Sequence, residues 1–209
     1  MGRNSGSNRK GGLPEGDFDG GGKGIKVPKD LAGLVTIQNP QVYKSVKQAI
    51  SRFHSVLGVR QKEVKIGTLP AGVGGVHFTE NGASKLVVLS KRVFNGKGTT
   101  TGSVAGWASS GYRSGHLTKT NKAVAHIPTH ELAHATWNAH MTSPKHKAAG
   151  REISKLYRSW MRDKKKSGYG RYASSNVSEF FAEVCTKAIH GKSDKYTTAV
   201  KKIIKKHQL

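Results

Sequence analysis

The pattern H-E-x-x-H within residues 129–137 (THELAHATW) restricts the possible folds of this chain more than any other segment does. His130 and His134 are four residues apart, so on a helix they lie on one face and both imidazoles can reach one metal ion. Glu131 then lies beside the open coordination position, where a carboxylate can take a proton from water. A five-residue pattern also arises by chance, and the alternative is a core helix with two hydrogen-bonded histidines.

The charge balance of the chain is strongly basic. Its 209 residues include 36 lysines and arginines against 12 acidic residues, which gives a formal net charge of +24. Such an excess favours contact with a polyanion, either nucleic acid or an anionic surface, and solubility is an equally good explanation. The few carboxylates are informative, because Glu131, Glu179 and Glu183 gather in and around the candidate metal motif.

Length and composition indicate a single domain preceded by a tail. Residues 1–26 are Gly-rich and basic and lack the apolar core of a signal peptide, so we expect a disordered arm before a domain at residues 27–209. The single Cys185 excludes a disulfide framework and a Cys-ligated metal centre, and its apolar surroundings predict a buried, inert thiol. No run of 18 apolar residues is present, so no transmembrane segment is predicted.

The first half of the domain is predicted to combine a helix with a small sheet. Asn39-Pro40 is typical of a helix start, and Gly58 ends the apolar periodicity that follows it. Alternating or continuous apolar residues predict strands at residues 59–69, 75–79 and 85–90. The last two flank Asn81-Gly82, which indicates a hairpin.

Residues 95–121 are rich in Gly, Ser and Thr and predict a long loop. We expect at most one edge strand within it, near residues 103–108, where an extended substrate could add as a further strand. A mobile connector is the alternative.

The second half is predicted to be helical. Pro128 either opens the motif helix or kinks it just before His130. Further helices are expected from Ser143-Pro144 to a stop at residues 164–168, from Asn176 to His190, and from Ser193-Asp194 to Lys206.

Catalytic zinc usually has three protein ligands, and three residues compete for the third position. His140 has the spacing of the metzincins, but Trp137 stands where those enzymes need a glycine. His146 loosely resembles the arrangement in SprT-like proteases, which act on proteins crosslinked to DNA. Glu179 is favoured, because Glu179 and Glu183 lie four apart on an apolar helix, where burying two carboxylates without a cation is unfavourable.

The segment at residues 172–183 reads YASSNVSEFFAE. With H-E-x-x-H before it, the pattern Y-x-x-x-N-x-x-E-F-F-A-E resembles the zinc peptidase domains of the anthrax lethal factor type, which are found in toxins and phage head-associated proteins. The resemblance covers roughly residues 123–190. It implies that Glu179 is the third zinc ligand and that Tyr172 stabilises the transition state.

The resemblance further implies a zincin-like α+β fold and a gluzincin-type zinc endopeptidase with a protein or peptide substrate. Zn²⁺ would bind His130, His134 and Glu179, Glu131 would act as the base, and Glu183 would orient a histidine ligand.

Two readings compete with the endopeptidase: a basic nucleic-acid-associated virion protein with a structural or inactive metal site, and an SprT-like protease. A location in a phage virion, or in a host cytoplasm after delivery, agrees with the resemblance, and a delivered toxin is equally compatible with it.

Overall fold

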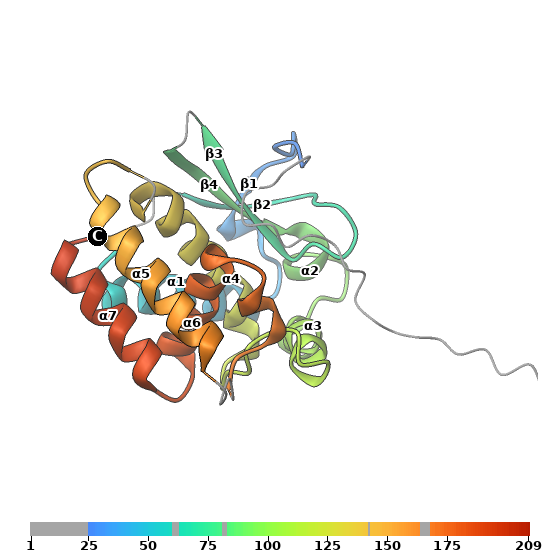
Figure 1. Cartoon of the computed structure of the whole chain (residues 1–209). Coiled ribbons are helices and arrows are strands. Elements are labelled where there is room, and N and C mark those ends of the chain that lie inside the picture. Colours follow the sequence, from blue (N-terminus) through green and yellow to red (C-terminus); the bar gives the residue numbers. More distant parts are fainter. Residues whose placement is uncertain (1–24, 60–62, 81–82, 142, 164–167) are drawn as a thin grey trace, which may run out of the picture.

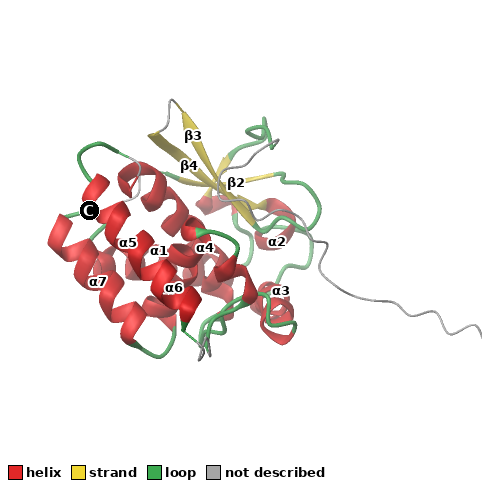
Figure 2. Cartoon of the chain, viewed as in Figure 1, coloured by secondary structure: helices red, strands yellow, loops and turns green. Residues whose placement is uncertain are grey.

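The computed structural model describes residues 25–59, 63–80, 83–141, 143–163 and 168–209. These residues form an α+β fold in which a small mixed sheet lies beside a larger set of helices (Figures 1 and 2). The predicted fold class is therefore confirmed at this level. Of the predicted disordered arm, residues 1–24 lie outside the described part of the chain. Among the described residues, no helix combines the length and apolar character that crossing a bilayer requires.

Within the described residues, the sheet contains four strands in the order β1–β2–β4–β3. Their bounds are Ala32–Gly33 (β1), Val64–Gly67 (β2), Gly75–Glu80 (β3) and Ala83–Ser90 (β4). β2 is parallel to β4, and the β1–β2 and β3–β4 pairs are antiparallel. The predicted hairpin is confirmed as β3–β4, with His77 opposite Val87. Its turn, Asn81-Gly82, lies outside the described residues, and β2 covers only part of the strand predicted at residues 59–69.

The central strand β4 is apolar on both faces because both faces are covered. Val87 and Leu89 belong to the main core that the helices share. Leu86 and Val88 belong to a smaller cluster, which also contains Phe78. The alternation of side chains along a strand accounts for this division.

The first long helix, α1 (Pro40–Leu57), begins and ends as predicted. The Asn39 side chain accepts hydrogen bonds from the backbone N–H groups of Gln41 and Val42, and Gly58 takes a left-handed conformation with φ 73°. Two short elements lie nearby in the sequence. The 3₁₀ turn η1 (Leu34–Thr36) precedes α1, and the helix α2 (Lys91–Phe94) follows β4.

The loop predicted at residues 95–121 is wrong in its central part, and so is the edge strand at residues 103–108, because α3 (Thr101–Arg113) occupies both. A capping box forms between Thr100 and Ser103, each side chain accepting from the backbone N–H of the other. A Cβ at Gly111 would lie 2.6 Å from Leu117, so this glycine permits close packing. The small residues of this segment, whose composition is typical of a loop, therefore allow a helix to pack closely.

Two antiparallel helices form the centre of the molecule: α4 (Ala123–Thr136) and α6 (Val177–His190) (Figure 1). Pro128 lies inside α4, five residues after its first residue, and does not open it. A single π-helical turn, η2 (Trp137–Met141), continues α4. α6 is confirmed as predicted, with Asn176 as its N-cap and Gly191 after its last residue.

The remaining helices surround this pair. α5 (Lys147–Arg162) begins four residues later than Ser143, and residues 164–167 of its predicted stop lie outside the described residues. α7 (Lys195–His207) is confirmed, with Asp194 capping its first turn. The 3₁₀ turn η3 (Arg171–Ser174) leads into α6. Cys185 is fully buried in α6, as predicted.

Candidate metal centre

Three side chains from the central helix pair converge on one point. His130 Nε2 and His134 Nε2, both from α4, lie 3.0 Å apart. Glu179 Oε2, from the first turn of α6, lies 3.1 Å from each of these nitrogens. All three side chains are at least 96% buried, with exposed fractions of 4% or less. Glu179 is more than forty positions from either histidine in the sequence. The fold thus brings the three residues together in a buried group that could hold a metal ion.

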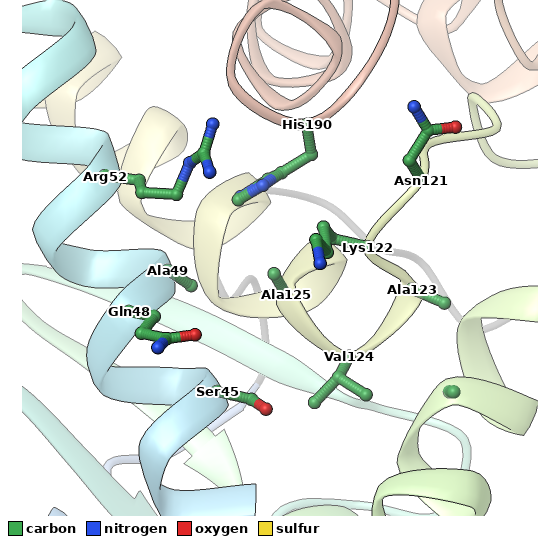
Figure 3. A pocket seen from close by; sticks show the side chains of 11 residues that line it. Ser45, Gln48, Ala49, Arg52, Asn121, Lys122, Ala123, Val124, Ala125 and His190 are labelled. Carbon is green, nitrogen blue, oxygen red and sulfur yellow. The ribbon is translucent and has the colours of Figure 1, made fainter.

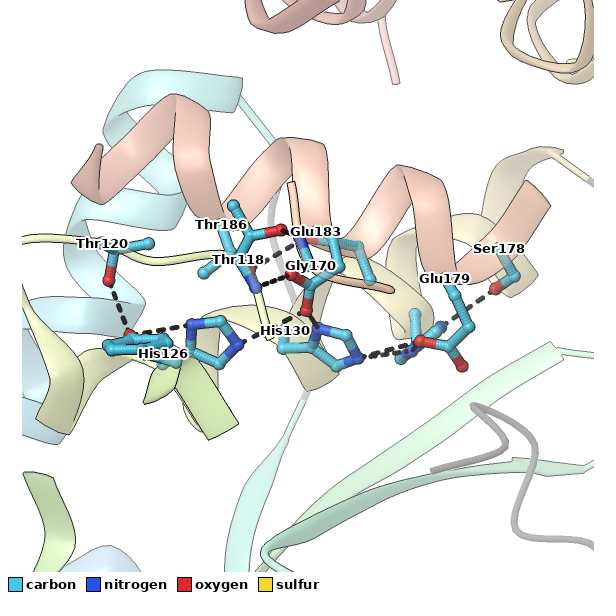
Figure 4. Close-up of polar contacts among 12 residues, drawn as sticks. Thr118, Thr120, His126, His130, Gly170, Ser178, Glu179, Glu183 and Thr186 are labelled. Atoms are coloured by element: carbon cyan, nitrogen blue, oxygen red, sulfur yellow. Dashed lines mark hydrogen bonds and ion pairs between the residues drawn. The ribbon is translucent and has the colours of Figure 1, made fainter. Parts of the chain in front are cut away.

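The other ring nitrogen of each histidine, Nδ1, contacts a side chain of α6. Ser178 Oγ lies 3.0 Å from His134 Nδ1. Glu183 Oε1 lies 3.1 Å from His130 Nδ1, an ion-pair distance whose angle falls short of a well-formed hydrogen bond. Both Nδ1 atoms thus face oxygen atoms of α6, whereas both Nε2 atoms face Glu179. Figure 4 shows His130 between Glu183 and Glu179. Glu183 therefore lies where the sequence predicts, behind a histidine and away from the centre itself.

The charges of this cluster are strongly coupled. Burial favours the neutral form of His130, but its close contacts with the Glu179 and Glu183 carboxylates and their negative charges outweigh burial and raise the pKa of His130 well above its ordinary value. Burial likewise opposes ionisation of Glu179, yet His134 and His130 lower its pKa to about 2. Burial also opposes ionisation of Glu183, but His126 and His130 lower its pKa well below the ordinary value. Glu179 and Glu183 are thus both ionised and require positive charge between them, from a proton or from a metal ion.

The donor set fits a divalent metal. Two imidazole nitrogens and one carboxylate oxygen are a common ligand set of catalytic zinc, which leaves a fourth position open. Zinc–ligand bonds of about 2.0–2.1 Å in tetrahedral geometry separate ligand atoms by about 3.3 Å. The separations of 3.0–3.1 Å between the three donor atoms are close to that value.

Glu131 is buried beside this group, with 4% of its surface exposed. Burial raises its pKa, an effect that the two motif histidines partly oppose, and the backbone N–H of His77 in β3 donates to its carboxylate. Gly75 in the same strand allows this approach, since a Cβ there would lie 2.7 Å from Glu131 Cγ. The edge strand β3 is therefore packed directly against the motif glutamate.

Tyr172, in η3, lies beside the same group of side chains. Its ring stacks on His130 with centroids 5.8 Å apart and lies 4.8 Å from the His116 ring. Burial, followed by the charges of Glu179 and Glu131, raises its pKa far above the ordinary value, and its hydroxyl hydrogen-bonds to Glu179. The hydroxyl thus keeps its proton at neutral pH.

A second buried group, absent from the sequence-based prediction, adjoins the first. His126 Nε2 lies 3.4 Å from Glu183 Oε1, and His126, His130 and Glu183 together could also hold a metal ion. Glu183 Oε2 accepts a hydrogen bond of 2.6 Å from the backbone N–H of Thr118. On its other side, His126 Nδ1 lies 3.1 Å from the Tyr112 hydroxyl. The four-residue spacing of His126, His130 and His134 is a sequence signal that could have revealed this extension.

His77 was also missed and has no such signal. It is fully buried in β3, its ring stacks on His134 at 6.0 Å, and Asn138 Nδ2 lies 2.6 Å from its Nε2. Burial lowers its pKa to about 3, so it is neutral. Only the folded arrangement of β3 over α4 places it here.

The other two candidates for the third ligand, His140 and His146, lie elsewhere. Their rings contact each other edge to face with centroids 5.1 Å apart. Among the described residues, neither belongs to a group that could hold a metal ion. The geometry thus favours Glu179 over both histidines.

Comparisons with protein-family models, with curated proteins and with solved structures found no match.

Proposed function

We propose that the protein is a zinc-dependent endopeptidase of a zincin-like fold, with His130, His134 and Glu179 as the metal ligands. The observation that supports this most directly is the convergence of their three donor atoms at 3.0–3.1 Å in a buried site. The orientation of both imidazoles by Ser178 and Glu183 adds to it, because partners of this kind fix the tautomer that binds metal.

When bound, zinc supplies Lewis-acid polarisation of a water molecule and of the scissile carbonyl group. Glu131 takes the proton of the attacking water and later delivers it to the leaving amine. Its raised pKa suits this exchange, since a base that titrates closer to neutral pH can both accept and release a proton. The hydrogen bond from the His77 backbone holds the carboxylate in place between these steps.

Tyr172 acts on the oxyanion that develops at the carbonyl carbon. Because its pKa is strongly raised, its hydroxyl remains a hydrogen-bond donor throughout the working pH range. Its ring is held between His130 and His116, so the hydroxyl is positioned before substrate arrives.

We place the substrate along β3. Among the described strands β3 has only β4 as a neighbour, so an extended peptide would pair along its other edge. Its residues Gly75 and His77 contact Glu131 through a close approach and a hydrogen bond, so a peptide paired there would pass beside the base. In this proposal β3 is the edge strand that pairs with the substrate, a role predicted from the sequence for residues 103–108.

The test is a Glu131→Gln variant compared with the wild type. We expect one zinc per chain in both by elemental analysis, and a loss of turnover of about 10²–10⁴-fold in the variant, the usual contribution of a general base. Mass spectrometry of peptides from a digested proteome provides the activity measurement. A Glu131→Gln protein with wild-type turnover would rule out the mechanism.

Nucleic-acid binding is a second candidate function, supported by one face of α5. Lys147, Arg151, Lys155 and Arg158 are exposed and, with Trp137, line a groove of about 350 Å³. Within the described residues none of these cations has an acidic partner. Cations beside an aromatic ring suit a single strand, whose bases stack while its phosphates pair with the cations.

Binding of a labelled single-stranded oligonucleotide at several salt concentrations tests this candidate. The double variant Arg151→Gln/Arg158→Gln should flatten the salt dependence by about two phosphate contacts, whereas Lys44→Gln on α1 should leave the slope within about one contact of the wild type. Equal slopes for the wild type and the double variant would contradict the assignment to α5. Such binding is one property that a genome-associated protein of a phage virion would need.

A further inference from the structure

A pocket lies at the end of the central helix pair that is away from the candidate metal centre, where α4 begins and α6 ends. Its volume is about 420 Å³, and Figure 3 shows it between α1 and the first turn of α4. The side chains that line it come from α1 (Ser45, Gln48, Ala49, Arg52), from α3 (Ala105), from residues 121–125 and from His190. None of the residues proposed to bind zinc lines it.

The charged groups of this pocket are all positive. Arg52 and Lys122 line it, and the lining contains no carboxylate. The only hydrogen bond of the Arg52 side chain among the described residues is a long one of 3.4 Å to the Ile189 carbonyl oxygen. The guanidinium therefore retains most of its five donors for a ligand.

The first turn of α4 adds backbone donors. Lys122 is the N-cap residue, and its side chain cannot accept a hydrogen bond, so the turn has no side-chain cap. Ala123, Val124 and Ala125 line the pocket, and the 14-residue helix directs the positive end of its dipole there. The Ala125 N–H donates to the Lys122 carbonyl oxygen, so the donors that the turn offers a ligand are the N–H groups of Ala123 and Val124.

His190 provides the independent sign of a ligand. Its side chain is only 6% exposed, lines the pocket, and extends between Arg52 and Lys122 (Figure 3). Its Nε2 lies 2.9 Å from the Thr129 hydroxyl, whereas its buried Nδ1 has no hydrogen-bond partner among the described residues. Burial, followed by Arg52, lowers its pKa to about 4, so the imidazole is neutral. When the Thr129 hydroxyl donates to Nε2, the ring proton is on Nδ1, which can then donate to a ligand.

We propose that this pocket binds the phosphate group of a small molecule. The donors are the side chains of Arg52 and Lys122, His190 Nδ1, and the N–H groups of Ala123 and Val124. A tetrahedral oxyanion can accept from several of them at once. An unpartnered buried N–H is unfavourable, and a bound oxyanion would satisfy it. The site does not depend on the metal centre.

The experiment is isothermal titration calorimetry of the full-length protein with inorganic phosphate and, separately, with a nucleoside monophosphate. Arg52→Gln should weaken binding of either by about tenfold or more, because a charge-assisted pair is lost from the site. Lys47→Gln is the matched control: it removes the same charge from an exposed position of α1 that does not line the pocket. Its affinity should stay within about twofold of the wild type.

Two further measurements make the result specific. The His190 imidazole NMR signals should shift on phosphate addition, and Glu179→Ala, which lacks a ligand of the metal centre, should bind phosphate as the wild type does. Tighter binding of the nucleotide identifies an organic phosphate as the ligand, and equal binding identifies the free anion. No binding by the wild type, equal weakening by Arg52→Gln and Lys47→Gln, or loss of binding in Glu179→Ala would overturn the proposal.

Discussion

The two halves of the α4–α6 pair attract opposite charges. Where α4 ends and α6 begins, two histidines and Glu179 converge with both carboxylates of α6 ionised, and the site requires a cation. Where α4 begins and α6 ends, Arg52 and Lys122 flank the neutral His190, and no carboxylate lines the space.

Helix direction accounts for part of this difference. The C-terminal end of a helix favours cations and the N-terminal end favours anions. The first turn of α6 stabilises the Glu179 carboxylate, and because the helices are antiparallel, the first turn of α4 lies at the other end of the pair. At the opposite end, the first turn of α4 faces a pocket without acidic residues. One helix pair can therefore support two sites that should respond separately to substitution.

The largest expected effect is that of Glu179→Ala on the metal centre alone. Removing the only carboxylate among the three donors leaves an open, two-histidine site. Zinc content should fall from about one per chain to near zero, with loss of peptidase activity, while phosphate affinity should not change. Elemental analysis and calorimetry of one preparation give both quantities, and full zinc occupancy in the variant would exclude Glu179 as a ligand.

A smaller effect is expected from Glu183→Gln. The change keeps an acceptor for the Thr118 N–H but removes the charge behind His130, so the metal-binding tautomer is less well held. Zinc affinity should fall by about 10–100-fold, the usual effect of losing such a partner. Competition with a chromogenic chelator measures it. An unchanged affinity would show that Glu183 does not orient His130.

Gly75→Ala tests the contact between β3 and the base. The new Cβ would meet Glu131 Cγ at 2.7 Å and Ile127 Cγ2 at 3.0 Å, and overpacking of this kind costs about 1–3 kcal/mol. We expect lower turnover with zinc retained, because Glu131 is displaced while His130 and His134 are not touched. Steady-state kinetics and zinc analysis together decide this, and a fully active variant would place β3 further from the base.

The pH dependence of the metal-free protein follows from the same cluster. The raised pKa of His130 contributes stability that is fully present below its ordinary pKa of 6.5 and is lost as pH rises through the raised value. The pKa of Glu179 is lowered from 4.5 to about 2, so its contribution is present above 4.5 and is lost as pH falls towards 2.

The chelator-treated protein should therefore lose up to about 1.4 kcal/mol per pH unit above 6.5 for this one proton. Zinc should reverse the loss, because metal binding releases the proton. Urea denaturation at several pH values, with and without zinc, provides the measurement. Identical curves with and without zinc would mean that no metal occupies the centre.

The smallest effect is expected outside both regions, at Gly106→Ala in α3. Nothing lies within 4 Å of the added Cβ, and alanine is favoured over glycine inside a helix. The protein should gain about 0.5–1 kcal/mol, measured as the free energy of unfolding, with zinc and phosphate affinities unchanged. Destabilisation would contradict the helical assignment of this segment, and the variant is the control for Gly75→Ala.

Much of the helical structure was predictable because its signals are local. Asn39, Asn176 and Asp194 cap helices whose apolar periodicity is regular, and Gly58 and Gly191 stop two of them. The loop predicted where α3 lies was wrong for a physical reason. Gly and Ser residues have a weak helix propensity, but a capping box and close packing stabilise the helix in spite of it.

The candidate site divides in the same way. His130, His134 and Glu179 follow from spacing and motif, since each pattern is confined to one helix. His77 and the partners of His126 could not be predicted, because their positions depend on how β3 and residues 112–120 cross the helix pair. Such contacts join segments far apart in sequence and have no local pattern.

The division of the proposed metal ligands between α4 and α6 has a consequence for biosynthesis. A nascent chain that has emerged only as far as η3 has both histidines of the motif but lacks the carboxylates of α6 that complete the candidate centre. If the proposed site binds zinc, it can do so only after α6 has emerged from the ribosome and packed against α4, so a shorter nascent chain would lack the proposed peptidase activity.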